Sequence, residues 1–152
     1  MDTFELLKYY TGDIVPQENV VFVFGSNPEG RHGLGAAKVA REQFGARWGI
    51  GEGLVGNSYG IPTKDLRIKD NHGYRSVAPS SIIESIKKFY DIARMHPNKV
   101  FKIAYRNTYR RSLCGYSGLE LFNMFRSAGD FPSNVHISEE WYNAFVKGKS
   151  IN

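Results

Sequence analysis

Several features that mark whole classes of protein are scarce or missing in this sequence of 152 residues. Cys114 is the single cysteine, so no disulfide can form within the chain and a reducing compartment is favoured. No apolar run approaches the roughly 20 residues that span a bilayer, and the first ten residues lack the layout of a signal peptide. We therefore expect a soluble cytoplasmic protein that has no membrane partner.

Two common kinds of site are also missing. No Gly-Lys-Ser or Gly-Lys-Thr follows the glycine-rich segment near residue 30, so the Walker pattern of nucleoside triphosphatases is absent there. No group of histidine, cysteine and aspartate residues has the spacing of metal ligands. We therefore expect neither a metal site nor another cofactor.

The charge of the chain favours an anionic partner. Twenty basic residues against fifteen acidic ones give a formal net charge of +5. Free nucleotide, phosphorylated metabolite, RNA and DNA all fit that charge, and so does an ordinary solubilising surface. Arg106, Arg110 and Arg111 suggest a nucleic-acid-binding module, but the basic residues are too scattered to form a stripe. Nucleic acid is therefore the least favoured of these partners.

Strand-like and helix-like segments alternate along the chain. A short helix or strand is expected before Gly12. Strands are expected at 18–26, 59–62, 99–106 and 134–138, and helices at 35–46, 79–99, 118–129 and 139–147. Ser81 and Glu84 have the spacing of a capping box for the second of these helices. The alternation predicts one α/β domain, residues 1–152, with helices around a largely parallel or mixed sheet.

Two glycine-rich loops follow predicted strands, where open α/β sheets bind their ligands. Ten of the sixteen glycines lie between Gly25 and Gly60, and the segment "GSNPEGRHGLGAAK" leads from a strand into a helix. The segment "GYSG", residues 115–118, leads into another helix. Backbone N–H groups at such junctions bind anions, so a pyrophosphate held between the loops is predicted. Taken singly, each loop also has a structural explanation as a tight turn.

Polar side chains near these loops are candidates for chemistry. His32 is the one histidine of the first loop, and an imidazole can act as a general acid or base near neutral pH. Lys64 and Asp65 end a predicted strand, where Lys64 would neutralise a phosphate and Asp65 would orient a water. The structural alternatives are a loop-capping hydrogen bond for His32 and a surface turn with paired charges for Lys64 and Asp65.

The segment "TGDIVPQENVVFVFGSN" resembles the opening of the macro domain family. That family begins with Gly-Asp-Ile and a strand that ends in an asparagine, and Asp13 and Asn27 match this interval, fourteen positions apart. The segments "GEGLVGNSYGIPTKD", "GYSG" and "NVHISEEWYNAF" are similar to later parts of the family. The wording looks closest to small macro-like proteins of bacteria and tailed phages and suggests a T-even phage as the source, hence a host cytoplasm. The resemblance implies a three-layer fold with a mixed central sheet flanked by helices.

The resemblance also implies a pocket for ADP-ribose or a derivative. Asp13 would accept a hydrogen bond from the adenine amino group, and Asn27 would lie by the distal ribose. Tyr116 would cross the diphosphate, with Trp141 or Tyr142 near the adenine. The residues expected to bind the ligand are Asp13, Ile14, Gly25, Ser26, Gly33, Gly35, Ala36, Lys64, Gly115, Tyr116, Ser117 and Gly118. Those expected to take part in catalysis are Asn27, His32 and Asp65.

One departure from the family bears on activity. Macro domains that hydrolyse ADP-ribosyl esters commonly carry an acid in the glycine loop, whereas "GRHGLGAAK" has none. The favoured expectation is a phosphatase that removes the terminal phosphate of ADP-ribose-1″-phosphate. An ADP-ribosyl hydrolase and a reader that binds ADP-ribose without turnover are the alternatives.

Overall fold

The computed structural model describes residues 7–66 and 75–147. The strands are β1 (Lys8–Tyr10), β2 (Val20–Ser26), β3 (Gly53–Val55), β4 (Ser58–Pro62), β5 (Val100–Ile103) and β6 (Val135–Ser138). The helices are α1 (Gly35–Gln43), α2 (Pro79–Met95), α3 (Gly118–Ser127) and α4 (Glu139–Trp141), and α4 continues as a π-helical turn, η2 (Tyr142–Val146). No helix in the described ranges is long and apolar enough to cross a membrane.

The strands form one mixed sheet in the order β1-β6-β5-β2-β4-β3. Every neighbouring pair is parallel except β3 and β4, which are joined by a tight antiparallel connection. Because β2, β4 and β5 are parallel neighbours, their carboxyl ends meet at one edge of the sheet. The loops that follow these three strands are therefore brought together.

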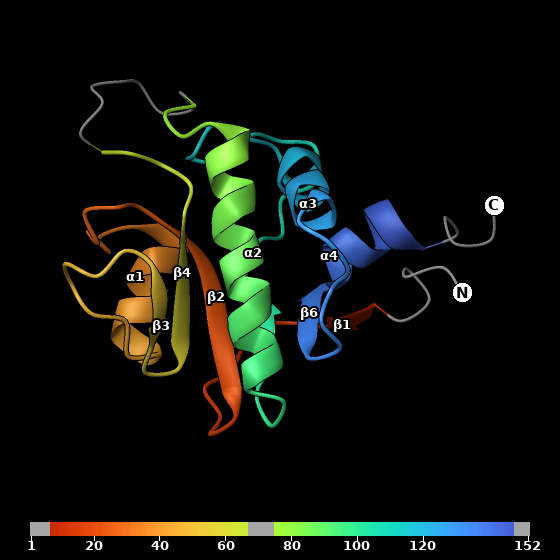
Figure 1. The fold of residues 1–152 in the computed structure, drawn as a ribbon, viewed down its shortest axis with the longest axis horizontal. Coiled ribbons are helices and arrows are strands. Elements are labelled where there is room, and N and C mark those ends of the chain that lie inside the picture. The colour runs from red at the N-terminus through yellow and green to blue at the C-terminus, as the bar shows by residue number, and fades with distance from the viewer. Residues whose placement is uncertain (1–6, 67–74, 148–152) are drawn as a thin grey trace.

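Helices cover both faces of this sheet, with α1 behind it and α2 in front in Figure 1. Side chains alternate along β2, so that Val21 and Val23 belong to the core under α2 and α3. Phe22 and Phe24 point the other way, into a second core that includes Ala40 of α1. The predicted α/β fold, in which a mixed sheet is flanked by helices on both faces, is confirmed.

Helices α2 and α3 begin where the sequence predicts, but their capping differs from expectation. Helix α2 begins at Pro79, and its N-cap residue, Ala78, makes no side-chain capping bond, so the predicted capping box of Ser81 and Glu84 is wrong. Proline suits the first helical position because its φ is already helical and its missing N–H has no partner to lose there. A full capping box is found at α3 instead, between Ser117 and Glu120.

Three other elements refine the sequence prediction. The segment before Gly12 is a strand, β1, and the short strand β3 was not predicted at all. The last helix is present, but over residues 142–146 it widens into η2. Strand β3 has only three residues, and all three are partly buried. Its sequence therefore lacks the alternation of buried and exposed residues that predicts a strand.

A row of basic side chains crosses the half of the sheet formed by β1, β6 and β5. Lys8 pairs with His136 across one strand boundary, and His136 pairs with Lys102 across the next. Burial, with smaller contributions from the ammonium groups of Lys8 and Lys102, lowers the pKa of His136 to about 4. The imidazole is therefore neutral in the folded protein near pH 7.

We predict that the His136→Gln variant loses less stability than the wild-type protein on mild acidification. In the unfolded chain the imidazole takes up a proton below its ordinary pKa of about 6.5, whereas in the folded protein it stays neutral until about pH 4. The free energy of unfolding therefore falls as the pH falls through this window. Urea unfolding at pH 7 and pH 5 should show a smaller decrease for the variant. An equal decrease in both proteins would contradict the assignment.

Candidate functional site

A cleft of about 630 Å³ lies at the edge where β2, β4 and β5 end. Four segments and one isolated side chain, Trp48, line it. The other lining residues are Gly25 and Ser26 at the end of β2; Asn27 and Arg31 in the loop after it; Gly33, Leu34, Gly35, Ala36 and Ala37 at the start of α1; Thr63, Lys64 and Leu66 after β4; and Ala104, Tyr105, Arg106, Asn107, Ser112, Leu113 and Cys114 after β5. The cleft thus occupies the position at which open α/β sheets bind ligands.

The start of α1 forms one wall of the cleft. Leu34, the N-cap residue of α1, is extended and offers no side-chain acceptor, and the first turn holds no acidic residue. Gly35 begins the helix with a φ of +57°, which favours glycine. The N–H groups at the first turn of a helix and the helix dipole both attract negative charge.

The charged side chains of the cleft act in the same direction. Among the described residues, those that line it with a charge are Arg31, Lys64 and Arg106, and all three are basic. The Lys64 ammonium donates to the carbonyl of Leu113 over 3.1 Å, so it joins two segments of the cleft wall. The site as a whole is suited to a phosphate-bearing ligand.

The floor of the cleft includes Tyr105, which the sequence did not single out. Its ring stacks on Trp141 with centroids 5.9 Å apart, and its hydroxyl lies 3.3 Å from that of Thr63. A Cβ at Gly25 would lie 2.0 Å from this hydroxyl, so the strand end can carry no side chain there. Burial raises the pKa of Tyr105, which keeps the phenol protonated and able to donate a hydrogen bond.

Asn27 holds the loop after β2 in shape. Its side-chain amide donates to the carbonyl of Arg31 over 2.9 Å and accepts from the N–H of Arg31 over 2.8 Å. The backbone N–H of Gly30 also donates to the Asn27 carbonyl. Asn27 lines the cleft as predicted, but its polar atoms are engaged within the loop.

The same loop packs against a second glycine-containing segment, residues 47–51. The N–H of Gly49 donates to the carbonyl of Gly30 over 2.9 Å. A Cβ at Gly51 would lie 1.9 Å from the carbonyl oxygen of Asn27. The two backbones approach so closely that only glycine fits at position 51.

His32 lies behind the cleft wall and does not line it. The side chain is fully buried, with its ring edge-on to Phe24 at a centroid distance of 5.4 Å. Burial, with a smaller contribution from Arg41, lowers the pKa of His32; the backbone of Ile50 acts in the opposite sense but forms no hydrogen bond of normal geometry with Nδ1. Nε2 lies 3.4 Å from the hydroxyl of Ser26, which is the one link from this imidazole to the cleft.

Asp13 and Ile14 lie outside the wall of the cleft. The Asp13 side chain is 93 % exposed and pairs with Arg106 over 3.4 Å, so the expected buried carboxylate is not found. Arg106 also donates to the carbonyl of Gly12, which ties the segment before β2 to the cleft. Ile14 is a core residue beside α1.

Asp65 also stays out of the cleft. It lies beyond β4, where its backbone N–H donates to the Ser76 hydroxyl over 2.8 Å. Its neighbours Lys64 and Leu66 line the cleft, but Asp65 does not. The side chain predicted to orient a water is therefore at the rim.

In the second predicted anion-binding loop, residues 115–118, and the helix turn after it, backbone N–H groups are bonded within the protein. The N–H of Ser117 and that of Glu120 are taken by the capping box, and Leu119 donates to the carbonyl of Thr108 over 2.7 Å. None of the residues from Gly115 to Gly118 lines the cleft. The structure therefore does not bring the two glycine loops together around one pyrophosphate.

The aromatic residues expected near the ligand are used in the core. Tyr116 is buried and donates to the carbonyl of Val77 over 2.6 Å. Trp141 is fully buried, and its indole N–H donates to Asn107. Tyr142 stacks on Tyr9, which leaves none of the three at the cleft.

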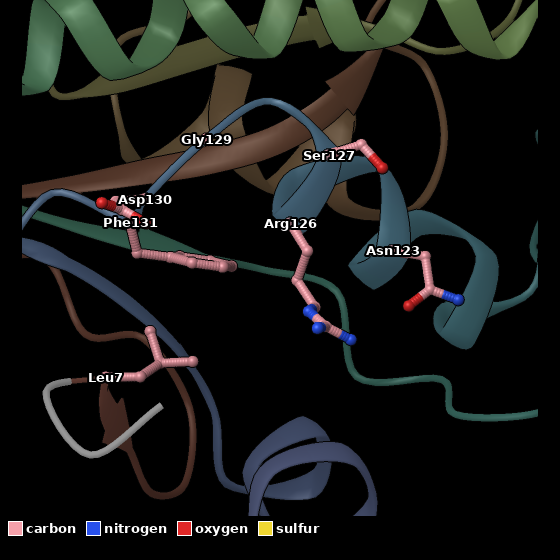
Figure 2. A pocket seen from close by; sticks show the side chains of 7 residues that line it. All are labelled: Leu7, Asn123, Arg126, Ser127, Gly129, Asp130 and Phe131. Atoms are coloured by element: carbon pink, nitrogen blue, oxygen red, sulfur yellow. The ribbon is translucent and has the colours of Figure 1, made fainter. Parts of the chain in front are cut away.

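Figure 2 shows a smaller hollow of about 340 Å³ on another part of the molecule. It is formed by Leu7, the last turns of α3 and the segment that follows them. None of the residues that the sequence singled out lies in it. Within the described ranges, no group of three or more His, Cys, Asp or Glu side chains could hold a metal ion.

Comparisons with protein-family models, with curated proteins and with solved structures find no match to this chain. The resemblance to macro domains therefore stays a prediction.

We predict that Gly51→Ala and Gly33→Ala differ sharply in stability. The methyl group at position 51 would meet the carbonyl of Asn27, whereas at position 33 it would meet no atom within 4 Å. Forced overpacking costs about 1 to 3 kcal/mol of unfolding free energy, while Gly33→Ala should change it by less than about 0.5 kcal/mol. Urea denaturation of both variants measures the difference, and similar values would contradict the close contact.

Proposed function

We propose that the cleft binds ADP-ribose or a derivative of it. The observation that carries the proposal is the glycine loop that runs into the uncapped start of α1, in a cleft whose charged side chains are basic. Backbone N–H groups at a helix start bind phosphate oxygens, and the helix dipole adds to the attraction. A diphosphate fits both features.

The size and composition of the cleft also support a nucleotide-sized ligand. Its volume of about 630 Å³ lies within the range of about 300 to 1,000 Å³ that is typical of small-molecule sites. Apolar side chains, among them Leu34, Leu66 and Leu113, line it beside the basic ones. A ligand with a planar base, sugars and a diphosphate matches this mixture.

The resemblance supplies an orientation for the ligand. It puts the adenine by Asp13, which in the structure pairs with the cleft residue Arg106. It puts the distal ribose by Asn27, whose loop packs against residues 47–51; these precede β3, which lies on the far side of β2 from β5. We therefore place the adenine near Arg106, the diphosphate at the start of α1 and the distal ribose at the Asn27 loop.

Binding without turnover is the activity that we favour. Among the described residues that line the cleft, none has a carboxylate or an imidazole. His32 and Asp65, the predicted acid–base residues, both lie outside the wall. Arg110 and Arg111 are also absent from it, which favours a pocket ligand over nucleic acid.

Removal of the terminal phosphate of ADP-ribose-1″-phosphate is a second candidate, for one reason. The Ser26 hydroxyl lines the cleft and lies 3.4 Å from a neutral imidazole nitrogen of His32. Such a pair can activate a hydroxyl or a water. Phosphate release that disappears in both His32→Asn and Ser26→Ala, with binding retained, would establish this activity over simple binding.

We predict that ADP-ribose binds with micromolar affinity and that Arg31→Ala weakens it about tenfold or more. A hydrogen bond to a charged group contributes about 1.5 to 3 kcal/mol, and Arg31 lines the cleft. Arg94→Ala is the matched control, because Arg94 lies on α2 and pairs with Asp91. Isothermal titration calorimetry gives the affinities, repeated at two salt concentrations because nucleic-acid binding would weaken steeply with salt. Absence of heat at millimolar ADP-ribose with folded protein would refute the proposal.

The orientation has a test of its own in Asp13→Ala. Loss of the carboxylate removes the expected partner of the adenine amino group and the ion pair with Arg106, which keeps its hydrogen bond to the Gly12 carbonyl. We expect ADP-ribose affinity to fall about tenfold, which corresponds to about 1.4 kcal/mol. Ribose 5-phosphate, which lacks the adenine, should bind wild type and variant equally. Unchanged ADP-ribose affinity would remove the adenine from this end of the cleft.

A further inference from the structure

One aromatic side chain of the cleft has no part in the function proposed above. The chain has two tryptophans; Trp141 is fully buried, whereas Trp48 is 60 % exposed and lines the cleft. An indole has a large apolar face, and Trp48 shares the cleft with a second exposed apolar side chain, Leu34, as in the apolar patches that mark binding sites. Trp48 therefore needs an explanation that the core does not provide.

The backbone beside Trp48 is held in place although its side chain is exposed. Gly49 donates to the carbonyl of Gly30, and Ile50 donates to the carbonyl of Arg47 over 3.2 Å. Gly51 lies against the Asn27 carbonyl so closely that a Cβ would not fit. The indole is thus carried on a fixed turn that packs against the loop after β2.

This turn lies at the distal-ribose end of the cleft. Trp48 precedes β3 and packs next to the Asn27 loop, whereas Arg106 follows β5, and β3 and β5 lie on opposite sides of β2. In the proposed orientation, the adenine is near Arg106. ADP-ribose has only a sugar at its other end and no aromatic ring, so Trp48 would have no planar heterocycle to stack on.

We propose that Trp48 stacks on a planar nitrogen heterocycle attached to the distal ribose. The ligand class is then an ADP-ribose derivative that carries such a ring at C1″, rather than free ADP-ribose. Leu34, which is 69 % exposed and lines the same cleft, offers a second apolar contact. The inference rests on the proposed function, because it takes the position of the diphosphate and adenine from it.

Two available probes differ in this ring alone. NAD⁺ is ADP-ribose with a nicotinamide at C1″, and NADH carries the uncharged form of that ring. Using both forms separates stacking from the effect of ring charge, since Arg31 lines the cleft and would repel a cation. Trp48→Ala removes the stacking face, Trp48→Phe keeps an aromatic ring, and Tyr109→Ala is the control because Tyr109 is exposed and lies outside the cleft wall.

Calorimetry of the three probes on wild type and the three variants tests the inference. We expect Trp48→Ala to weaken at least one nicotinamide probe about tenfold or more, as for the loss of a base–aromatic stack, and ADP-ribose less than twofold. Trp48→Phe should recover most of the loss, and Tyr109→Ala should change nothing. Selective tryptophan fluorescence should respond to the nicotinamide probes through Trp48, since Trp141 is buried.

The other results each overturn the inference in a different way. Equal weakening of all probes by Trp48→Ala would place the adenine on Trp48. Unchanged affinities would leave Trp48 without ligand contact, and binding of ADP-ribose but of neither nicotinamide probe would show that a ring at C1″ does not fit. If no probe bound the folded wild-type protein, the proposed function itself would fail, and the inference with it.

Discussion

The backbone of Gly51 lies against the carbonyl of Asn27 at a distance that leaves no room for a side chain. This contact holds the loop after β2 to the turn that carries Trp48, and a hydrogen bond between Gly49 and Gly30 strengthens it. With both loops fixed, the strand end, the start of α1 and the exposed indole face one cleft. Gly30 and Gly51 are the glycines between residues 25 and 60 whose missing side chains allow this close approach of the two backbones.

The two helices that begin at a glycine, α1 and α3, differ in how their first turns are capped. At α3, the Ser117 side chain and Glu120 satisfy the first N–H groups from within the helix. At α1, the N-cap residue is Leu34, which has no acceptor to offer. Leu34 and the first residues of α1 line the cleft, whereas the N–H groups of Ser117 and Glu120 at α3 are taken by the capping box. Of these two helix starts, only that of α1 combines a missing side-chain cap with a position in the cleft wall.

Local features of the fold could be predicted from the sequence because their causes are local. The buried run at β2, the helix stop at Gly45 and the α/β alternation depend on side-chain periodicity and on single glycines, and all three are present. Tyr105, Arg106 and Trp48 reach the cleft only because distant strands become neighbours, and no short-range pattern contains that pairing. The burial of His32 behind Ser26 and the exposure of the Asp13 side chain also depend on packing between segments. The resemblance to macro domains could suggest their roles but not their burial.

The stacking of Tyr105 on Trp141 links the floor of the cleft to the last helical segment of the fold. Within the described sheet, strand β1 pairs only with β6. The first strand therefore also depends on residues 135–138 for its place in the sheet. During synthesis on the ribosome, a chain that has not yet released residues 135–146 would have the glycine loop and α1 but no support beneath Tyr105. Contacts between residues so far apart in the chain slow folding, because long loops must close first. A chain shortened before Trp141 would therefore lack the ring on which Tyr105 stacks, although it would still contain every residue of α1, α2 and α3 and every residue that lines the cleft.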